Sequence, residues 1–225
     1  MNSNPQDGTS VKKYGLALHT ASRELGLAIS NFAGDSRCQT WNLDRDLATH
    51  LHQYLIEFIG PQTWADFAFI AVAKGPGGFT GTRMGMVTAR TLAQQLDIPV
   101  FAVSTLAAVA WAEPPQPPLG KGGLLREDMA LQMPAQRGQL FGAVYSVNKD
   151  SGLTELFPDT VMTAESWQEK LESWENSYQL IEVGSELGWS VSSVLELAYL
   201  EWKQGSRPDW SDALPFYGQH PVKGH

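Results

Sequence analysis

The chain has 225 residues, of which 43% are hydrophobic and 18% charged, a composition typical of a globular protein with a sizeable core. Its formal net charge of −8 argues against a broad basic surface for nucleic acid, so any contact with RNA is expected to be indirect. The single cysteine, Cys38, excludes an internal disulfide and a cysteine-rich metal site, and it suits a reducing compartment such as the cytoplasm.

The sequence contains no sign of membrane insertion or of a metal centre. No segment approaches the roughly twenty apolar residues that a membrane helix needs. Residues 1–10 are polar, and we expect a disordered tail there, not a targeting peptide. His50 and His52 lie two positions apart, so on a helix they would point in different directions. We therefore expect no metal and no other cofactor.

In the first half, apolar runs and turn residues predict strands and helices in alternation. Leu47, Leu51 and Leu55 lie on one apolar face of a helix that Gly60 and Pro61 end. Ser104 is placed to cap a later helix. Predicted strands cover residues 14–19, 25–30, 38–43, 67–73 and 97–103, and predicted helices cover residues 44–59, 82–96 and 105–112.

A glycine-rich stretch over residues 74–85 lies between the predicted strand and helix. Its glycines permit positive φ or the close approach of another backbone, and Pro76 prevents a continuing ladder. Because Thr82 and Arg83 follow Gly81, the stretch does not match the phosphate-binding loop of nucleotide-binding proteins. Two interpretations remain: a turn that directs N–H groups at an anion, or a tight strand-to-helix turn with a packing role.

The helix after this turn carries small residues at four-residue spacing, namely Gly85, Ala89 and Ala93. A row of small side chains lets a neighbouring helix approach closely. Met84 and Val87 are among the residues that supply bulk elsewhere on the helix. We therefore expect this helix to be packed on two sides.

The second half repeats the element order of the first. Residues 113–124 are rich in proline and glycine and read as an exposed connector. The repetition predicts two α/β lobes, residues 11–112 and 125–225, each with a mixed sheet whose parallel strands are joined by helices. Predicted strands of the second lobe cover residues 129–133, 140–145, 153–157 and 178–183, and predicted helices cover residues 165–174 and 191–202.

Four segments, residues 16–22, 71–85, 98–106 and 136–141, together resemble the TsaB (YeaZ) family. The most specific is the run Gly-Pro-Gly-x-Phe-Thr-Gly-x-Arg-x-Gly that begins at Gly75. The resemblance implies a duplicated actin/Hsp70-like fold of the ASKHA, ribonuclease H-like type. It also implies a non-catalytic subunit that binds and activates a TsaD-type threonylcarbamoyltransferase, alongside a TsaE-like ATPase. That complex forms N6-threonylcarbamoyladenosine at position 37 of tRNA, which this subunit would meet only through the complex.

The resemblance also implies where the partner binds. The contact would be helix-on-helix, through the two helices that flank the glycine turn, and a homodimer could use the same helices when the partner is absent. The residues expected to bind the partner are Leu47, Leu51, Leu55, Gly75, Pro76, Gly77, Phe79, Thr80, Gly81, Arg83, Gly85, Ala89 and Ala93.

Two departures from the family pattern bear on an enzymatic alternative, a nucleotide-using or glycoprotease-like (M22-type) hydrolase. His19 stands where the family usually has an aspartate, which helps to hold the nucleotide's metal in catalytic relatives. Pro134 stands where an aspartate often occurs in the second lobe. Such a hydrolase would place the glycine turn on a phosphate, with Arg83 or Lys74 as the cation. No Ser/His/Asp set is evident at usable spacing.

Overall fold

The computed structural model describes residues 13–113, 128–148 and 152–218. Within these ranges, no helix is both long enough and apolar enough to cross a membrane. The first half forms β1 (Tyr14–His19), β2 (Glu24–Ser30), β3 (Ser36–Asn42), α1 (Leu47–Ile59), β4 (Phe67–Ala73), α2 (Phe79–Leu96), β5 (Val100–Val103) and α3 (Thr105–Ala112). The second half forms β6 (Asp128–Pro134), β7 (Gln139–Asn148), β8 (Gly152–Thr163), α4 (Ala164–Glu172), β9 (Tyr178–Glu182) and α5 (Val191–Lys203).

The two sheets share one topology. The first has the strand order β3-β2-β1-β4-β5, and the second has the order β8-β7-β6-β9. In both, the first three strands of the half pair antiparallel, and the fourth pairs parallel with the first. The β5 strand extends the first sheet by one further parallel pairing. The duplicated α/β arrangement predicted from the element order is therefore confirmed.

Several element boundaries differ from the expected ones for local reasons. Helix α2 begins at Phe79, three residues early, because the N–H of Thr82 already donates to the C=O of Gly78 at 2.9 Å. Strand β5 begins only at Val100, since Asp97 adopts a left-handed conformation that closes α2. Strand β8 is more than twice as long as expected. Its residues are half-buried or exposed, so the sequence shows only a weak alternation of apolar and polar side chains. Residues 1–10 and 114–124, the expected tail and nearly all of the connector, lie outside the described residues.

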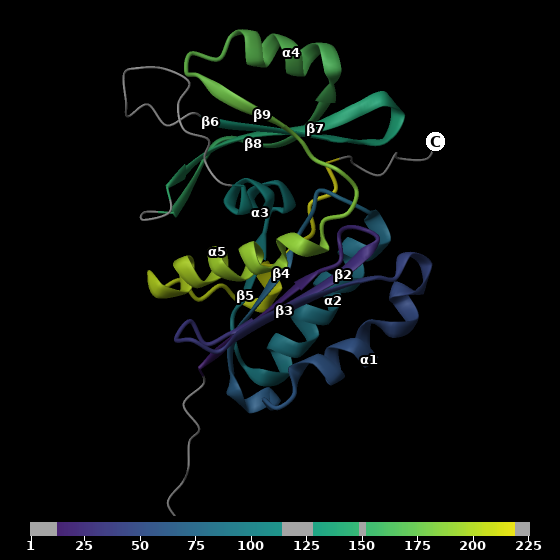
Figure 1. Cartoon of the computed structure of the whole chain (residues 1–225), viewed down its shortest axis with the longest axis vertical. Coiled ribbons are helices and arrows are strands. Elements are labelled where there is room, and N and C mark those ends of the chain that lie inside the picture. The colour runs from purple at the N-terminus through teal and green to yellow at the C-terminus, as the bar shows by residue number, and fades with distance from the viewer. Residues whose placement is uncertain (1–12, 114–127, 149–151, 219–225) are drawn as a thin grey trace, which may run out of the picture.

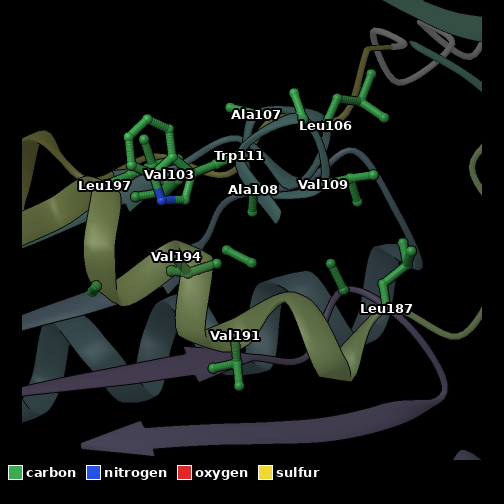
Figure 2. Packing of buried hydrophobic residues seen from close by; sticks show 14 of the residues in the cluster. Val103, Leu106, Ala107, Ala108, Val109, Trp111, Leu187, Val191, Val194 and Leu197 are labelled. Carbon is green, nitrogen blue, oxygen red and sulfur yellow. The ribbon is translucent and has the colours of Figure 1, made fainter. Parts of the chain in front are cut away.

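Helices α3 and α5 form a middle layer between the two sheets (Figure 1). Helix α5, which we expected in the second lobe, packs on β1, β2 and β4 of the first sheet, whereas α3, from the first half, contacts β6 and β7. The reason is that α3 is apolar on all sides and buries every residue except Ala112. Such a helix must pack against other elements on every face. Figure 2 shows α3 lying across α5, with Val191 pointing from α5 toward the strands.

Two large clusters of buried side chains fill the remaining space. One lies between the first sheet and the pair α1 and α2, which cover its outer face (Figure 1). The other is continuous through both lobes, and it includes Ala21 from the β1–β2 turn together with Met133 and Phe141 from the second sheet. The two lobes therefore share a hydrophobic core.

Candidate functional site

The glycine turn between β4 and α2 is fastened to the turn between β1 and β2. The N–H of Gly78 donates to the C=O of Ala21 at 2.7 Å. In the other direction, the Oγ1 hydroxyl of Thr20 donates to the C=O of Gly81 at 2.8 Å. Gly75 has φ of 99° and its C=O accepts from the N–H of Thr105 at 2.9 Å. Backbone groups of the turn are thus engaged by the chain itself.

The close approach of neighbouring backbone explains the glycines. A Cβ on Gly75 would lie 2.6 Å from the C=O oxygen of Phe216, and one on Gly85 would overlap the hydroxyl of Thr20. Added Cβ atoms on Gly77 and Gly81 would overlap the C=O oxygens of the β1–β2 turn. Of the two interpretations offered for the turn, these contacts favour the packing role.

The structure divides the residues expected to bind a partner into two sets. One set faces the protein's own interior, since the leucines of α1 and both alanines of α2 are at most 4% exposed. This set comprises Leu47, Leu51, Leu55, Gly75, Pro76, Gly85, Ala89 and Ala93. Gly77 is exposed and Gly81 is half-buried, although both lie against the β1–β2 turn. The other set, Phe79, Thr80 and Arg83, lies exposed at the start of α2.

The two cations suggested for a phosphate do not converge on the glycine turn. The guanidinium of Arg83 lies over the ring of Phe79, 5.4 Å from its centroid, on the outer surface. Lys74 lines a different cleft, beside Ser104 and Tyr145. A phosphate bound at the turn would therefore not be contacted by both Arg83 and Lys74.

His19, at the end of β1, is completely buried, and neither of its ring nitrogens hydrogen-bonds to another group of the described chain. Burial lowers its pKa from 6.5 to about 4, so the ring is neutral at pH 7. A neutral imidazole enclosed by protein supplies no carboxylate for a metal–nucleotide complex. Among the described residues, no group of three or more His, Cys, Asp or Glu side chains is placed to hold a metal ion.

The C-terminal segment crosses the glycine turn and joins the lobes, which the sequence pattern did not predict. The N–H of Phe216 donates to the C=O of Lys74 at 2.7 Å, and its ring meets that of Phe141 on β7, with centroids 6.2 Å apart. The ring of Tyr217 packs on that of Phe79, with centroids 4.7 Å apart. The segment thus covers the turn on the side that faces the second lobe.

An apolar groove of about 500 Å³ runs between the outer faces of α1 and α2. Ile56 is 63% exposed and Val87 is 61% exposed, although both side chains are large and hydrophobic. Within the part of the chain that the structure describes, no Asp, Glu, Lys or Arg lines the groove. The lining residues are Ala48, Leu51, His52, Leu55, Ile56, Trp64, Met84, Val87, Thr88, Thr91 and Leu92.

Most of these lining residues were not among the predicted site residues, although a local signal for them exists. On α2, Met84, Val87 and Thr91 follow one another at spacings of three and four, on a face separate from the row of small residues. On α1, Ala48, His52 and Ile56 follow one another at a spacing of four. A second stripe at helical spacing therefore marks the outer face of each helix.

Arg37 on β3 fixes the end of the helix that forms one wall of the groove. Its guanidinium donates to the C=O groups of Phe58, Ile59 and Gly60 at 2.9 to 3.0 Å, and to the side chain of Gln62 at 2.6 Å. A cation at a helix C-terminus satisfies carbonyls that lack a helical partner and favours the helix dipole. The position of α1 is thus set by a neighbouring strand.

Comparison with known proteins gives consistent matches. A family model described as TsaD, tRNA N6-adenosine threonylcarbamoyltransferase, matches residues 53–150. The tRNA threonylcarbamoyladenosine biosynthesis proteins TsaB of Bacillus subtilis and of Buchnera aphidicola from Acyrthosiphon pisum are 36% and 29% identical. These alignments cover 48% and 62% of this chain but only 42% and 61% of those proteins, so the chain matches about half of their length. YeaZ from Pseudomonas aeruginosa is 21% identical, with a TM-score of 0.69 over 91% of this chain and 99% of that one.

The fold is that of the duplicated actin-like class of α/β proteins, and in this chain the two lobes share a hydrophobic core. Within that class the matches to TsaB proteins agree with the motif that begins at Gly75. The chain is therefore similar to TsaB proteins in part of its sequence and to YeaZ in its fold.

Proposed function

We propose that this chain is a non-catalytic subunit that binds and activates a TsaD-type threonylcarbamoyltransferase in the formation of N6-threonylcarbamoyladenosine on tRNA. The observation that carries the proposal is the uncharged apolar groove between α1 and α2. The names of the similar TsaB proteins support the pathway. The negative charge of the chain supports a contact with tRNA made by the partner.

The partner's contact surface is the outer face of α1 and α2, where an amphipathic helix of the partner would lie in the groove. Exposed Ile56 and Val87 stand on its two walls and act as anchors, and the nearly buried Leu51 and Leu55 contribute to its lining. Met84 adds a flexible side chain that can adapt to the partner. Phe79, Thr80 and Arg83 extend the surface at the start of α2.

The inward-facing residues have a supporting part in this proposal. Gly85, Ala89 and Ala93 let α2 lie against the chain's own first sheet and the Thr20 turn, so that the opposite side of the helix is held in place. For this reason Gly85→Leu is a poor test of partner binding, since the larger side chain would disturb the chain's own packing. Variants of the exposed residues are needed.

The enzymatic alternative lacks a supporting feature in the described chain. A hydrolase that holds a phosphate at the glycine turn would need polar or charged groups facing that turn, whereas the neighbouring Ala21 belongs to an apolar cluster with Met133 and Phe141 of the second sheet. The buried neutral ring of His19 and the separation of Lys74 from Arg83 support the same conclusion.

The test compares Ile56→Asp and Val87→Asp with Leu180→Asp as a matched control. Leu180 is 45% exposed on β9 in the other sheet, so its replacement changes the surface to a similar degree away from the groove. Isothermal titration calorimetry with the TsaD-type protein of the same organism measures each Kd. A buried anchor replaced by a carboxylate costs at least about 2 kcal/mol, or about 30-fold in Kd, while the control stays near the wild-type value.

Threonylcarbamoyladenosine formed by the reconstituted proteins should fall in parallel with partner binding and recover when the variant concentration is raised. Equal affinity of wild type and both groove variants would refute the groove as the contact. Substrate turnover by the isolated chain would refute the non-catalytic role. Sedimentation of the chain alone tests whether a homodimer uses the same face, since the groove variants would then be monomeric.

A further inference from the structure

A second cleft, of about 260 Å³, opens on the opposite side of the first sheet, between the sheet's β5 edge, α5 and the β7–β8 hairpin. Unlike the groove, it is lined by groups that carry charge or donate and accept hydrogen bonds. The polar residues on its walls are Lys74, Ser104, Tyr145, Glu155, Glu201 and Gln204. They come from both halves of the chain, so only the folded molecule brings them together.

Among the described residues, Lys74 is the only cationic side chain that lines this cleft, and it forms no ion pair or side-chain hydrogen bond with the others. Its charge is nevertheless felt across the cleft. Burial raises the pKa of Glu201, and the positive charge of Lys74 opposes that rise. An ammonium near carboxylates, but bonded to none of them, is left with its hydrogen-bond donors available to a ligand.

The tyrosine in the wall is held by a carboxylate behind it. The hydroxyl of Tyr145 donates to Asp159 at 2.7 Å, and it lies 3.3 Å from the hydroxyl oxygen of Ser104. Ser104 also accepts from the N–H of Ala107 at 3.1 Å, as the cap of α3. Asp159 already accepts a hydrogen bond from Tyr145. The carboxylates that line the cleft and remain to bind a cation are those of Glu155 and Glu201.

The cleft thus presents one ammonium and two carboxylates within a volume smaller than the roughly 300 Å³ or more of a drug-sized site. A simple amine would meet the two carboxylates but leave Lys74 unpaired, and a simple carboxylate would pair with Lys74 but be repelled by Glu155 and Glu201. A molecule that carries an ammonium and a carboxylate on the same carbon atom can meet all three groups with favourable sign.

We propose that this cleft binds a small zwitterion of the α-amino acid class. Its carboxylate lies at Lys74 and its ammonium at Glu201 and Glu155, with the amide of Gln204 available to its side chain. The site lies apart from the α1–α2 groove, and its occupancy is measured on the isolated chain. This proposal can therefore be tested independently of partner binding.

Calorimetry with each of the twenty free amino acids in turn, at millimolar concentration, tests the site. At least one is expected to bind, and both its N-acetyl derivative and its methyl ester are expected to bind at least about tenfold more weakly, because each loses one charge. Lys74→Met and Glu201→Gln are each expected to lower the affinity for that amino acid by a similar factor. Glu172→Gln, at the exposed end of α4, is the control and leaves the affinity unchanged.

Urea denaturation establishes that each variant is folded before its affinity is read. Should Lys74→Met fail to fold, the wild-type chain still tests the proposal, because the amino acid is compared with its two blocked derivatives. Absence of binding by all twenty amino acids overturns the proposal. Equal binding of a blocked derivative, or tighter binding of a simple amine such as methylamine, also overturns it.

Discussion

Replacement of Gly85 by alanine is expected to destabilise the chain, although alanine is the better helix former. The added methyl group would overlap the hydroxyl oxygen of Thr20 and lie 3.3 Å from the Thr20 Cβ. Thr20 cannot move freely, since it is completely buried and its hydroxyl donates to the C=O of Gly81 at 2.8 Å. The variant must therefore shift α2 away from the β1–β2 turn or break that hydrogen bond.

The magnitude follows from three terms. Helix propensity favours alanine by about 1 kcal/mol. Overpacking of a filled site costs about 1–3 kcal/mol. Loss of the Thr20 hydrogen bond adds about 1 kcal/mol. The expected net loss in the free energy of unfolding is therefore about 2 kcal/mol, and for a chain of this length that lowers Tm by about 4–8 °C.

A double-mutant cycle in urea denaturation isolates the cause. Gly85→Ala is measured in the wild type and in a Thr20→Ala background, where the obstructing hydroxyl is absent. There it should cost less than about 0.5 kcal/mol, which gives a coupling near 2 kcal/mol between the two sites. Gly184→Ala serves as the control, because a Cβ at that position meets nothing within 4 Å. An equal cost of Gly85→Ala in both backgrounds would refute the reasoning.

Two further outcomes follow from the partly buried Arg37 and the completely buried His19. Arg37→Met should lower the free energy of unfolding by about 2 kcal/mol, because the carbonyls at the end of α1 lose their charged donor, whereas Arg45→Met, at an exposed position, should change it little in the same urea titration. His19 has a folded-state pKa of about 4 against 6.5 when unfolded, so its contribution is complete above pH 6.5 and is lost as pH falls toward 4. Between pH 7 and pH 5 the wild type should lose about 2 kcal/mol more than His19→Leu, and parallel pH profiles of the two proteins would contradict this.

Local patterns were sufficient to predict most elements and their repetition. The strand over residues 67–73 and the helix over residues 105–112 were predicted with the bounds that the structure has, because apolar runs and flanking breakers act within a few residues. The cap at Ser104, also predicted, is likewise a hydrogen bond between neighbours in sequence. Because these signals are local, the order of strands and helices, and with it the duplicated fold, could be predicted from the sequence.

Long-range packing decided which side of each element faces outward. Periodicity shows that Gly85, Ala89 and Ala93 share a face of α2, but it does not show whether that face meets a partner or the chain's own strands. In the folded chain the opposite face, with Val87, is the exposed one. The exchange of α3 and α5 between the halves, and the polar cleft at Lys74, depend on contacts between different elements that are distant in the sequence. Such contacts are set by the burial of apolar surface across the whole molecule, which no short stretch of sequence specifies.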